Sequence, residues 1–234
     1  MVYYNEYLSD IRYFIYGRKL MVNNTEPKIY FADLESTGLL HHLIEQGDKA
    51  KLHNFCAMSV DGKNMWTLHT DTDNERKTLQ RFLDRNIILV MHNGIQYDKY
   101  ALKHFGYDID KVHFVDTLAL SWYLDLYRAK HGLESYGEES GVPKPVIDDW
   151  EKLTQADYDN RVQEDVKIQE YTYRKLKGMF EELYGKMSDY EFCTHTVVRY
   201  LNFKMQQLAE QQNSKFRVDV EHAKSVIEKL EKEI

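Results

Sequence analysis

The sequence predicts an α/β protein in which a β-sheet of mixed direction is flanked by helices. Short apolar runs typical of buried strands recur in the first half of the chain. Stretches with helical spacing separate the later runs, and an Asp-Gly turn joins two of the earlier ones. Strands that come first, with helices between the later strands, indicate a mixed sheet.

The first part of the chain is expected to hold one helix and three strands. Residues 3–15 carry apolar side chains at helical spacing, and the polar segment 23–27 ends that helix. The apolar run 29–32 is typical of a buried strand. Residues 52–60 and 64–69 are expected to form a hairpin, because the Asp-Gly pair between them is a strong turn signal.

Helices and strands then alternate. Apolar positions at 79–83 have helical spacing, and 87–91 is a second buried strand. A helix over 97–105 is expected to end at Gly106, because glycine is favoured just after the last helical turn.

The next stretch leads from a strand to the longest helix. A strand at 113–116 is followed by a helix over 117–126, and 127–150 is expected to be a long loop around one short helix. Thr154 then opens a helix that continues to about Leu183.

The C-terminal part is expected to be helical. Ser188 with Glu191 forms a capping-box pattern for a helix to about Gln211, and a last helix begins near Asp219. That last helix carries an apolar stripe: Val220, Ala223, Ile227, Leu230 and Ile234. We expect a partner, or a downstream domain, to cover it.

Composition limits the function classes. The 234 residues, 43% of them hydrophobic, suffice for one domain with a buried core and a small appendage. A net charge of −7 argues against a passive nucleic-acid coat, which would need surplus Lys and Arg. It does not exclude an enzyme that meets one phosphate through metal ions.

The location is expected to be cytoplasmic, with no membrane partner. Cys56 and Cys193 form no metal-ligand spacing and no disulfide framework, so both are expected to be buried in a protein of a reducing compartment. The N-terminus lacks the apolar core of a signal peptide. No stretch approaches the ~20 apolar residues that span a bilayer.

Three short segments carry carboxylates suited to metal-dependent hydrolysis of phosphodiesters. Asp33 and Glu35 are two residues apart at a strand, so both point to one side of it. Asp98 begins a helix after an Asn-Gly loop, and Asp165 lies within the long helix. Each has an ordinary alternative, namely a strand-end cap, a helix-dipole partner or a solvated helix face. Considered one at a time, each carboxylate is explained better by such a structural role than by metal binding.

The order of these segments resembles a known family. FADLESTGL, HNGIQYD and RVQEDV are similar to the three exonuclease motifs of the DEDD superfamily. More narrowly, the chain resembles the proofreading exonuclease domain of phage family A DNA polymerases. VDTLALSWYL and HGLESYG are similar to further family elements, and FRVDVEHAKSVIEKLEKEI resembles the helix that opens the polymerase domain. The resemblance covers most of the chain and implies a ribonuclease H-like mixed sheet flanked by helices, with a helical C-terminal extension.

The resemblance also implies a site and its ligands. It gives Asp33, Glu35, Asp98 and Asp165 as ligands of two Mg²⁺ ions, which Mn²⁺ can replace, roughly 3.5–4 Å apart. Substrate-binding residues are then Leu39, Asn93, Tyr97 and His131. The implied organisation is an N-terminal helical extension (1–27), the exonuclease domain (28–185) and a helical linker to a polymerase (186–234).

One position departs from the family. The family usually has Tyr four residues before the last Asp, or His five residues before it, to orient the attacking water. Arg161 and Asn160 occupy these positions, and neither is a plausible general base. Arg161 is assigned to the catalytic set as a residue that holds the scissile phosphate or the water. The alternative is an ion pair with Asp165 one turn away. Tyr158 is a weaker substitute.

Three functions remain open from the sequence. The leading one is a 3′→5′ exonuclease that acts on single-stranded or frayed DNA ends as a proofreading module. Its polymerase would be either a separate subunit or a missing downstream domain, bound through residues 186–234. The second is a catalytically weakened scaffold that binds DNA or a polymerase. It is suggested by Arg161, which stands where the family usually has a tyrosine. The third is an exonuclease of the same superfamily that acts on RNA or in repair, because these motifs do not reveal 2′-OH discrimination.

Overall fold

The structure is a computed structural model that describes residues 26–142, 144, 152–214 and 218–232. The helix expected over 3–15 lies outside the described residues, as does almost all of the expected N-terminal extension.

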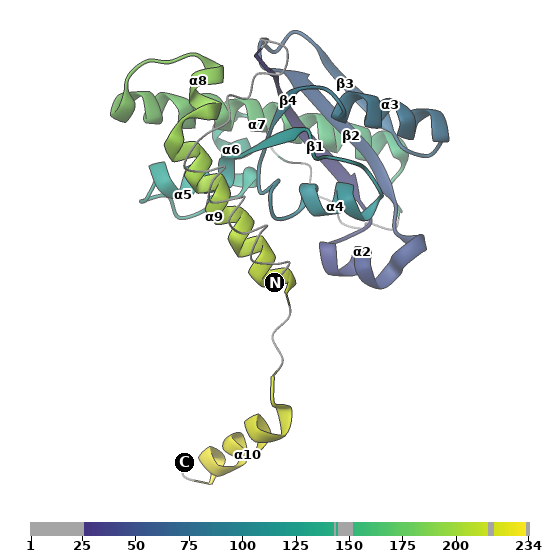
Figure 1. Ribbon diagram of the computed structural model, residues 1–234, viewed down its shortest axis with the longest axis vertical. Helices are drawn as coiled ribbons and strands as arrows, with labels where there is room; N and C mark the ends of the chain where they lie inside the picture. The colour runs from purple at the N-terminus through teal and green to yellow at the C-terminus, as the bar shows by residue number, and fades with distance from the viewer. Residues whose placement is uncertain (1–25, 143, 145–151, 215–217, 233–234) are drawn as a thin grey trace, which may run out of the picture.

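One five-stranded sheet forms the centre of the described part (Figure 1). Its strands stand in the order β3-β2-β1-β4-β5. β1 pairs antiparallel with β2 on one side and parallel with β4 on the other, which confirms the expected mixed sheet. The strands are β1 Lys28–Ser36, β2 Leu52–Ser59, β3 Met65–His69, β4 Ile87–Met91 and β5 Val112–Asp116.

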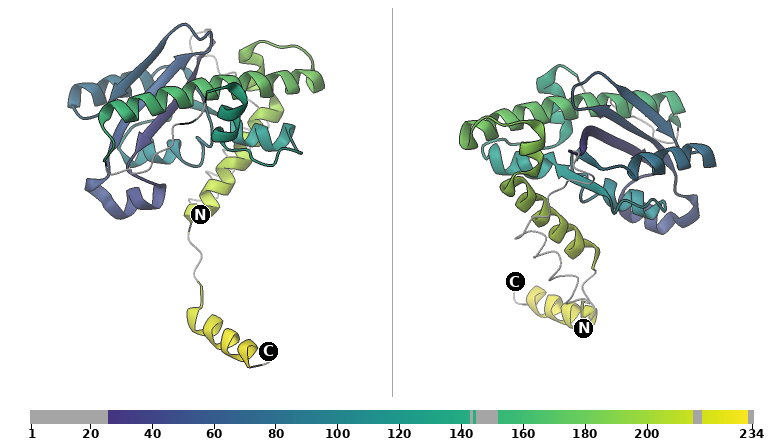
Figure 2. Two further views of the ribbon diagram at one scale, coloured as in Figure 1. Left: turned by 180° about the vertical axis from the view of Figure 1, so that it is seen from behind. Right: turned by 45° about the horizontal axis from the view of Figure 1, so that its top comes forward.

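Helices cover both faces of the sheet. The long helix α7 crosses one face, as Figure 2 shows, and packs on it together with α5, α8 and α9. The other face is covered by α2, α3 and α4. The helices on the two faces are α2 Leu40–Gln46, α3 Asp73–Leu83, α4 Asp98–His104, α5 Thr117–Leu124, α6 Leu133–Ser140, α7 Gln155–Tyr184, α8 Asp189–Thr194 and α9 Thr196–Asn213.

Local sequence signals explain where several elements start and stop. Thr154 caps α7, because its side chain accepts a hydrogen bond from the Asp157 backbone N–H in a capping box. The hairpin of β2 and β3 turns at Gly62, whose φ of 72° suits glycine, and Gly106 with φ of 82° follows α4. The expected turn and the expected helix stop are both confirmed.

Strand β1 is longer than the expected 29–32. Its antiparallel pairing with β2 continues from Tyr30 to Ser36, whereas its parallel pairing with β4 stops at Phe31. The polar residues Asp33 and Glu35 therefore lie within the strand, which the apolar run alone did not reveal. Beyond Phe31 the strand has no neighbour on its β4 side, and that is where the site opens.

The helix expected from Ser188 to about Gln211 is two helices. The backbone of His195 is extended between α8 and α9, and its ring Nδ1 accepts a hydrogen bond from the Val197 N–H at 3.2 Å. A side-chain cap in mid-sequence thus starts a new helix, which apolar periodicity cannot show. The predicted domain boundary at 185/186 stays a prediction.

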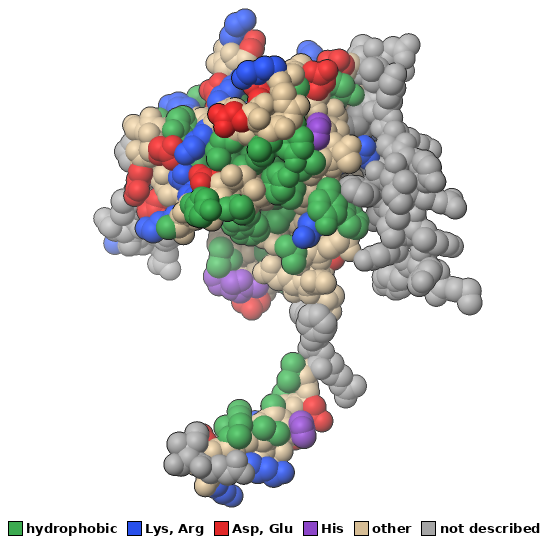
Figure 3. Space-filling view, turned by 90° about the vertical axis from the view of Figure 1, so that its left-hand side faces the viewer, with side chains coloured by type: hydrophobic (Ala, Val, Ile, Leu, Met, Phe, Trp, Pro, Cys, Tyr) green, Lys and Arg blue, Asp and Glu red, His purple; other side chains and the backbone are tan. Residues whose placement is uncertain are grey.

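The last helix, α10 Val220–Glu231, exposes its apolar stripe. None of its residues is buried, and Val220, Ile227 and Leu230 are each more than half exposed. Figure 3 shows hydrophobic side chains along this helix and gathered on one face of the body. Within the described residues, no helix is both long and apolar enough to cross a membrane.

Candidate active site

Three of the expected carboxylates meet between the sheet and α7. Asp33 and Glu35 alternate with Phe31 along β1, so their side chains share the face on which Phe31 packs against α7. Asp165 comes from that helix and is only 2% exposed. Carboxylate oxygens of Asp33, Glu35 and Asp165 all lie within 4.8 Å of one another. Strand alternation and helix packing therefore bring together residues more than 100 positions apart.

Asp98 joins this group from the N-terminus of α4. Its side chain is 3% exposed, and burial raises its pKa to about 8, with the charges of Asp116 and Glu35 adding to the rise. The pKa of Asp33 is raised well above its usual range, first by burial and then by the charges of Asp98 and Asp165. The charges of Asp98, Asp165 and Glu35 thus all act on Asp33, and we call these four carboxylates the carboxylate cluster.

The carboxylate cluster fits a hard divalent cation. Its donors are carboxylate oxygens, which Mg²⁺ and Mn²⁺ prefer. Asp98 Oδ1 and Asp165 Oδ1 are buried with no hydrogen-bond partner in the described part of the chain. Burying a carboxylate oxygen without a hydrogen-bond partner costs free energy. A cation bound by the Asp98 and Asp165 oxygens would remove that cost.

Two basic side chains already contact the carboxylate cluster. Arg161 Nε lies 2.7 Å from Glu35 Oε1, and Lys144 Nζ lies 2.5 Å from Asp165 Oδ2. Arg161 thus pairs with Glu35 across the gap to β1, and no ion pair between Arg161 and Asp165 is found among the described residues. Within the ranges that the structure describes, Asp165 Oδ1 has no hydrogen-bond partner, so Lys144 contacts only one of the two oxygens of that carboxylate.

The loop between β4 and α4 is held by a buried carboxylate, Asp116. It accepts hydrogen bonds from the backbone N–H groups of Asn93 at 3.0 Å, Ile95 at 3.1 Å and Leu118 at 2.9 Å. Burial nevertheless raises the pKa of Asp116 to about 6. Asn93 has a positive φ of 63°, a conformation that asparagine tolerates. Asp116 thus fixes the turn that delivers Asp98.

Gly94 in this loop has no room for a side chain. A Cβ at Gly94 would lie 2.4 Å from the Cβ of the buried Met91. We expect Gly94→Ala to cost roughly 1–3 kcal/mol of stability and to lower any activity, because the loop that positions Asp98 must shift. Thermal unfolding measures this. Gly178→Ala, on an open face of α7, should instead raise stability by up to about 1 kcal/mol. Equal stability of wild type and Gly94→Ala would contradict the expectation.

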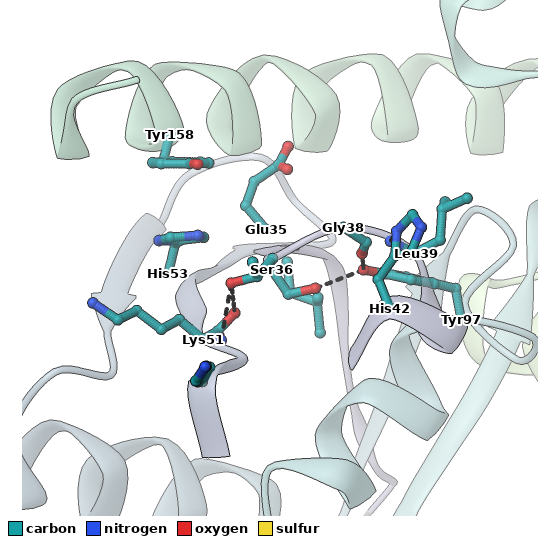
Figure 4. A pocket seen from close by; sticks show the side chains of 12 residues that line it. Glu35, Ser36, Gly38, Leu39, His42, Lys51, His53, Tyr97 and Tyr158 are labelled. Atoms are coloured by element: carbon teal, nitrogen blue, oxygen red, sulfur yellow. Dashed lines mark hydrogen bonds between the residues drawn. The ribbon is translucent and has the colours of Figure 1, made fainter. Parts of the chain in front are cut away.

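A pocket of about 700 Å³ opens beside Glu35 (Figure 4). Glu35 points between two groups of side chains: Leu39, His42 and Tyr97 on one side, and Lys51, His53 and Tyr158 on the other. The remaining lining residues are Leu34, Ser36, Thr37, Gly38 and Lys49.

Tyr97 and Leu39, both expected to bind substrate, line this pocket. Tyr97 Oη lies 2.6 Å from Ser36 Oγ and donates to the Gly38 carbonyl oxygen at 2.6 Å, which ties α4 to the end of β1. Burial raises the pKa of Tyr97 to about 12, so it is a donor at neutral pH. Leu39 is 60% exposed, as suits an apolar contact for a ligand.

The other expected substrate contacts lie outside the lining of the pocket. Asn93 is in the loop before α4, and its buried Oδ1 has no hydrogen-bond partner among the residues that the structure describes. His131 Nδ1 lies 2.7 Å from Ser121 Oγ on α5. His92, next to Asn93, is half-buried; burial lowers its pKa to about 4, and its Nδ1 lies 3.0 Å from Thr117 Oγ1. His92 is therefore neutral and structural.

Sequence reasoning missed four features of the site. Lys144, Lys51 and His53 lie outside the motifs, and no local pattern marks them. The fourth is Asp116, which could have been found as a helix N-cap directly after a strand. Tyr158, the weaker substitute named from the sequence, lines the pocket beside Glu35, and its ring stacks on His53 with centroids 3.9 Å apart.

Comparisons with known proteins support the fold. No protein-family model matches the sequence, and no curated protein matches it. Among solved structures, the chain is similar to NrnC of Brucella melitensis with bound Mg²⁺ (19% identity, 85% of this chain and 92% of that chain, TM-score 0.51). A structure of NrnC bound to pGG is also similar (21% identity, 85% and 92%, TM-score 0.50).

A third similar structure is the catalytic core of RRP6 from Trypanosoma brucei (15% identity, 78% of this chain and 46% of that chain, TM-score 0.51). At these identities the likeness concerns the fold. The chain has the ribonuclease H-like α/β fold, with a mixed five-stranded sheet flanked by helices.

Proposed function

We propose that this protein is a metal-dependent 3′→5′ exonuclease of the DEDD superfamily. The observation that carries the proposal is the carboxylate cluster, in which Asp33 and Glu35 of the first motif and Asp165 of the third have carboxylate oxygens within 4.8 Å of one another, while the charge of Asp98 of the second motif acts on Asp33. The unpaired oxygens of Asp98 and Asp165 support a role for these side chains as metal ligands. The fold shared with NrnC, solved with bound Mg²⁺, supports the same ion here.

Each residue of the cluster has a role in the proposed reaction. Asp33, Glu35, Asp98 and Asp165 hold two Mg²⁺ ions, which supply charge neutralisation on the phosphate and acidify the attacking water. Arg161 lies against Glu35 and one helical turn from Asp165, where its guanidinium can hold the scissile phosphate. Tyr158 has a pKa raised by burial, so it acts as a hydrogen-bond donor and not as a base.

The proposed substrate is the 3′ end of a single-stranded or frayed DNA strand. Leu39 and Tyr97, with Asn93 and His131, are its proposed contacts. The binding of pGG by NrnC supports recognition of a short oligonucleotide end within this fold. The exposed stripe of α10 supports attachment of a polymerase, as a separate subunit or as a downstream domain. An RNA substrate is the competing possibility.

The proposal is tested with 5′-labelled single-stranded DNA and RNA of one sequence, each with Mg²⁺, Mn²⁺ or EDTA. We expect a ladder that shortens from the 3′ end of DNA with either metal and disappears in EDTA. Protein carrying Asp33→Ala serves as the control for contaminating nuclease. Faster shortening of RNA would reassign the substrate, and internal cuts would exclude an exonuclease.

A catalytically weakened scaffold is the second candidate, and the Arg161–Glu35 ion pair is the observation that favours it. A folded protein that makes no ladder with either metal, yet binds DNA, would establish the scaffold and overturn the enzyme.

A further inference from the structure

The pocket beside Glu35 continues past the carboxylate cluster to a positively charged end. Lys51 lies at this end with the stacked rings of His53 and Tyr158, and Lys49 is a further residue of the pocket lining; both lysines are exposed. Figure 4 shows Lys51, His53 and Tyr158 together on the side of Glu35 away from Leu39 and Tyr97. Among the described residues that line the pocket, Glu35 is the only carboxylate, and Arg161 is already paired with it.

The two lysines differ from the other cations near the site. Arg161 and Lys144 both contact carboxylates of the cluster. In the described part of the chain, neither Lys49 nor Lys51 has a carboxylate within ion-pair distance. The positive charge of Lys51 acts on the pocket wall, since it adds to the burial that lowers the pKa of His53, while the charge of Asp71 acts in the opposite direction. Two cations without a carboxylate partner in a pocket present an electrostatic site for an anion.

We propose that the Lys49–Lys51 end of the pocket binds a second phosphate of the nucleotide whose own 5′-phosphate lies at the carboxylate cluster. This inference rests on the proposed function, which places a nucleotide end beside Glu35. A volume of about 700 Å³ lies within the range that encloses a whole small ligand. A nucleotide held between Leu39 and the cluster therefore has room for a further group toward the lysines.

Two sources would supply such a phosphate. One is a terminal monoester, which makes the enzyme tolerant of strands that end in a 3′-phosphate. The other is the phosphodiester to a further nucleotide, which would make a dinucleotide the bound end. Both present the same anionic oxygens to Lys49 and Lys51, and charge-assisted hydrogen bonds hold either one. The stack of His53 and Tyr158 forms a flat wall beside them.

The test compares the binding of three ligands with Ca²⁺ in place of Mg²⁺, so that no turnover occurs. They are thymidine 5′-monophosphate, thymidine 3′,5′-bisphosphate and a 5′-phosphorylated thymidine dinucleotide. We expect the bisphosphate to bind wild type at least about tenfold more tightly than the monophosphate. The double variant Lys49→Gln/Lys51→Gln should reduce that ratio to below about threefold. Lys103→Gln/Lys111→Gln, which changes two exposed lysines elsewhere, should leave it unchanged.

The outcomes separate the possibilities. A dinucleotide that gains the same lysine-dependent advantage identifies the second phosphate as an internal phosphodiester. An advantage confined to the bisphosphate identifies a terminal phosphate. Equal binding of monophosphate and bisphosphate by wild type, or a ratio that survives the double substitution, overturns the inference. Ligand binding without a metal-dependent ladder would instead count against the proposed function alone.

Discussion

Asp98→Asn is expected to abolish nuclease activity while it stabilises the metal-free protein. Loss of one ligand should lower kcat by more than about 100-fold, since changes to outer-shell partners of metal sites already cost 10–100-fold. The buried charge of Asp98 also opposes folding, because burial raises its pKa to about 8. Asparagine removes that charge and keeps the size of the side chain. We expect a rise in Tm of roughly 4 °C or more at pH 8 in EDTA.

The pH dependence of that gain has a definite sign. A carboxyl group whose folded pKa is raised favours folding while it is protonated, and the favourable contribution is lost as pH rises through the folded pKa. For Asp98 this window lies between its ordinary value of 3.8 and about 8. The Tm difference between Asp98→Asn and wild type should therefore widen from pH 4 to pH 8.

The matched control is Asp110→Asn, at an exposed aspartate outside the carboxylate cluster. Mg²⁺ should raise the Tm of wild type and of Asp110→Asn, and much less that of Asp98→Asn. A lower Tm for Asp98→Asn in EDTA, or activity within tenfold of wild type, would show that Asp98 is an ordinary helix-terminal residue.

Arg161→Met is expected to lower kcat and to strengthen Mg²⁺ binding at the same time. The guanidinium is the donor closest to Glu35, and its proposed contact with the scissile phosphate should contribute about 100-fold to kcat, as single preorganised donors do elsewhere. Removing its positive charge also leaves Glu35 free to bind a cation, so the Mg²⁺ dissociation constant should fall by roughly tenfold. Isothermal titration at pH 8 and single-turnover assays measure the two effects separately.

Arg174→Met is the control for this variant. Arg174 lies on the same helix and pairs with Asp189 at 3.2 Å, outside the carboxylate cluster. It should alter neither Mg²⁺ affinity nor kcat. Tighter Mg²⁺ binding by Arg161→Met with unchanged kcat would make Arg161 a competitor of the metal and not a catalytic residue.

Much of the fold followed from local patterns. The Asp-Gly turn, the Thr154 cap and the glycine after α4 each act over a few residues, so the sequence displays them directly. The extent of β1 did not follow, because it depends on β2, which pairs as far as Ser36. The break at His195 depends on one side-chain hydrogen bond within a continuous helical pattern.

For the site, the sequence supplied the carboxylates but not their surroundings. Asp33, Glu35 and Asp165 lie together because two of them alternate on a strand that faces α7. The pairing of Arg161 with Glu35, and not with Asp165, depends on the distance between helix and strand, which helical spacing does not contain. Lys51, Lys144 and His53 reach the site from segments without any motif, so only the tertiary structure reveals them.

The alternation of β1 also constrains how this protein can change over generations. Phe31, Asp33 and Glu35 face α7, while Ala32 and Leu34 face the opposite core. If Phe31 keeps its place, deleting or inserting one residue after it would turn Asp33 and Glu35 toward the apolar core and Leu34 toward the opening. Such an event would destroy reactivity and solubility together, so natural variants should differ by substitutions within β1 and by length changes only in its flanking turns.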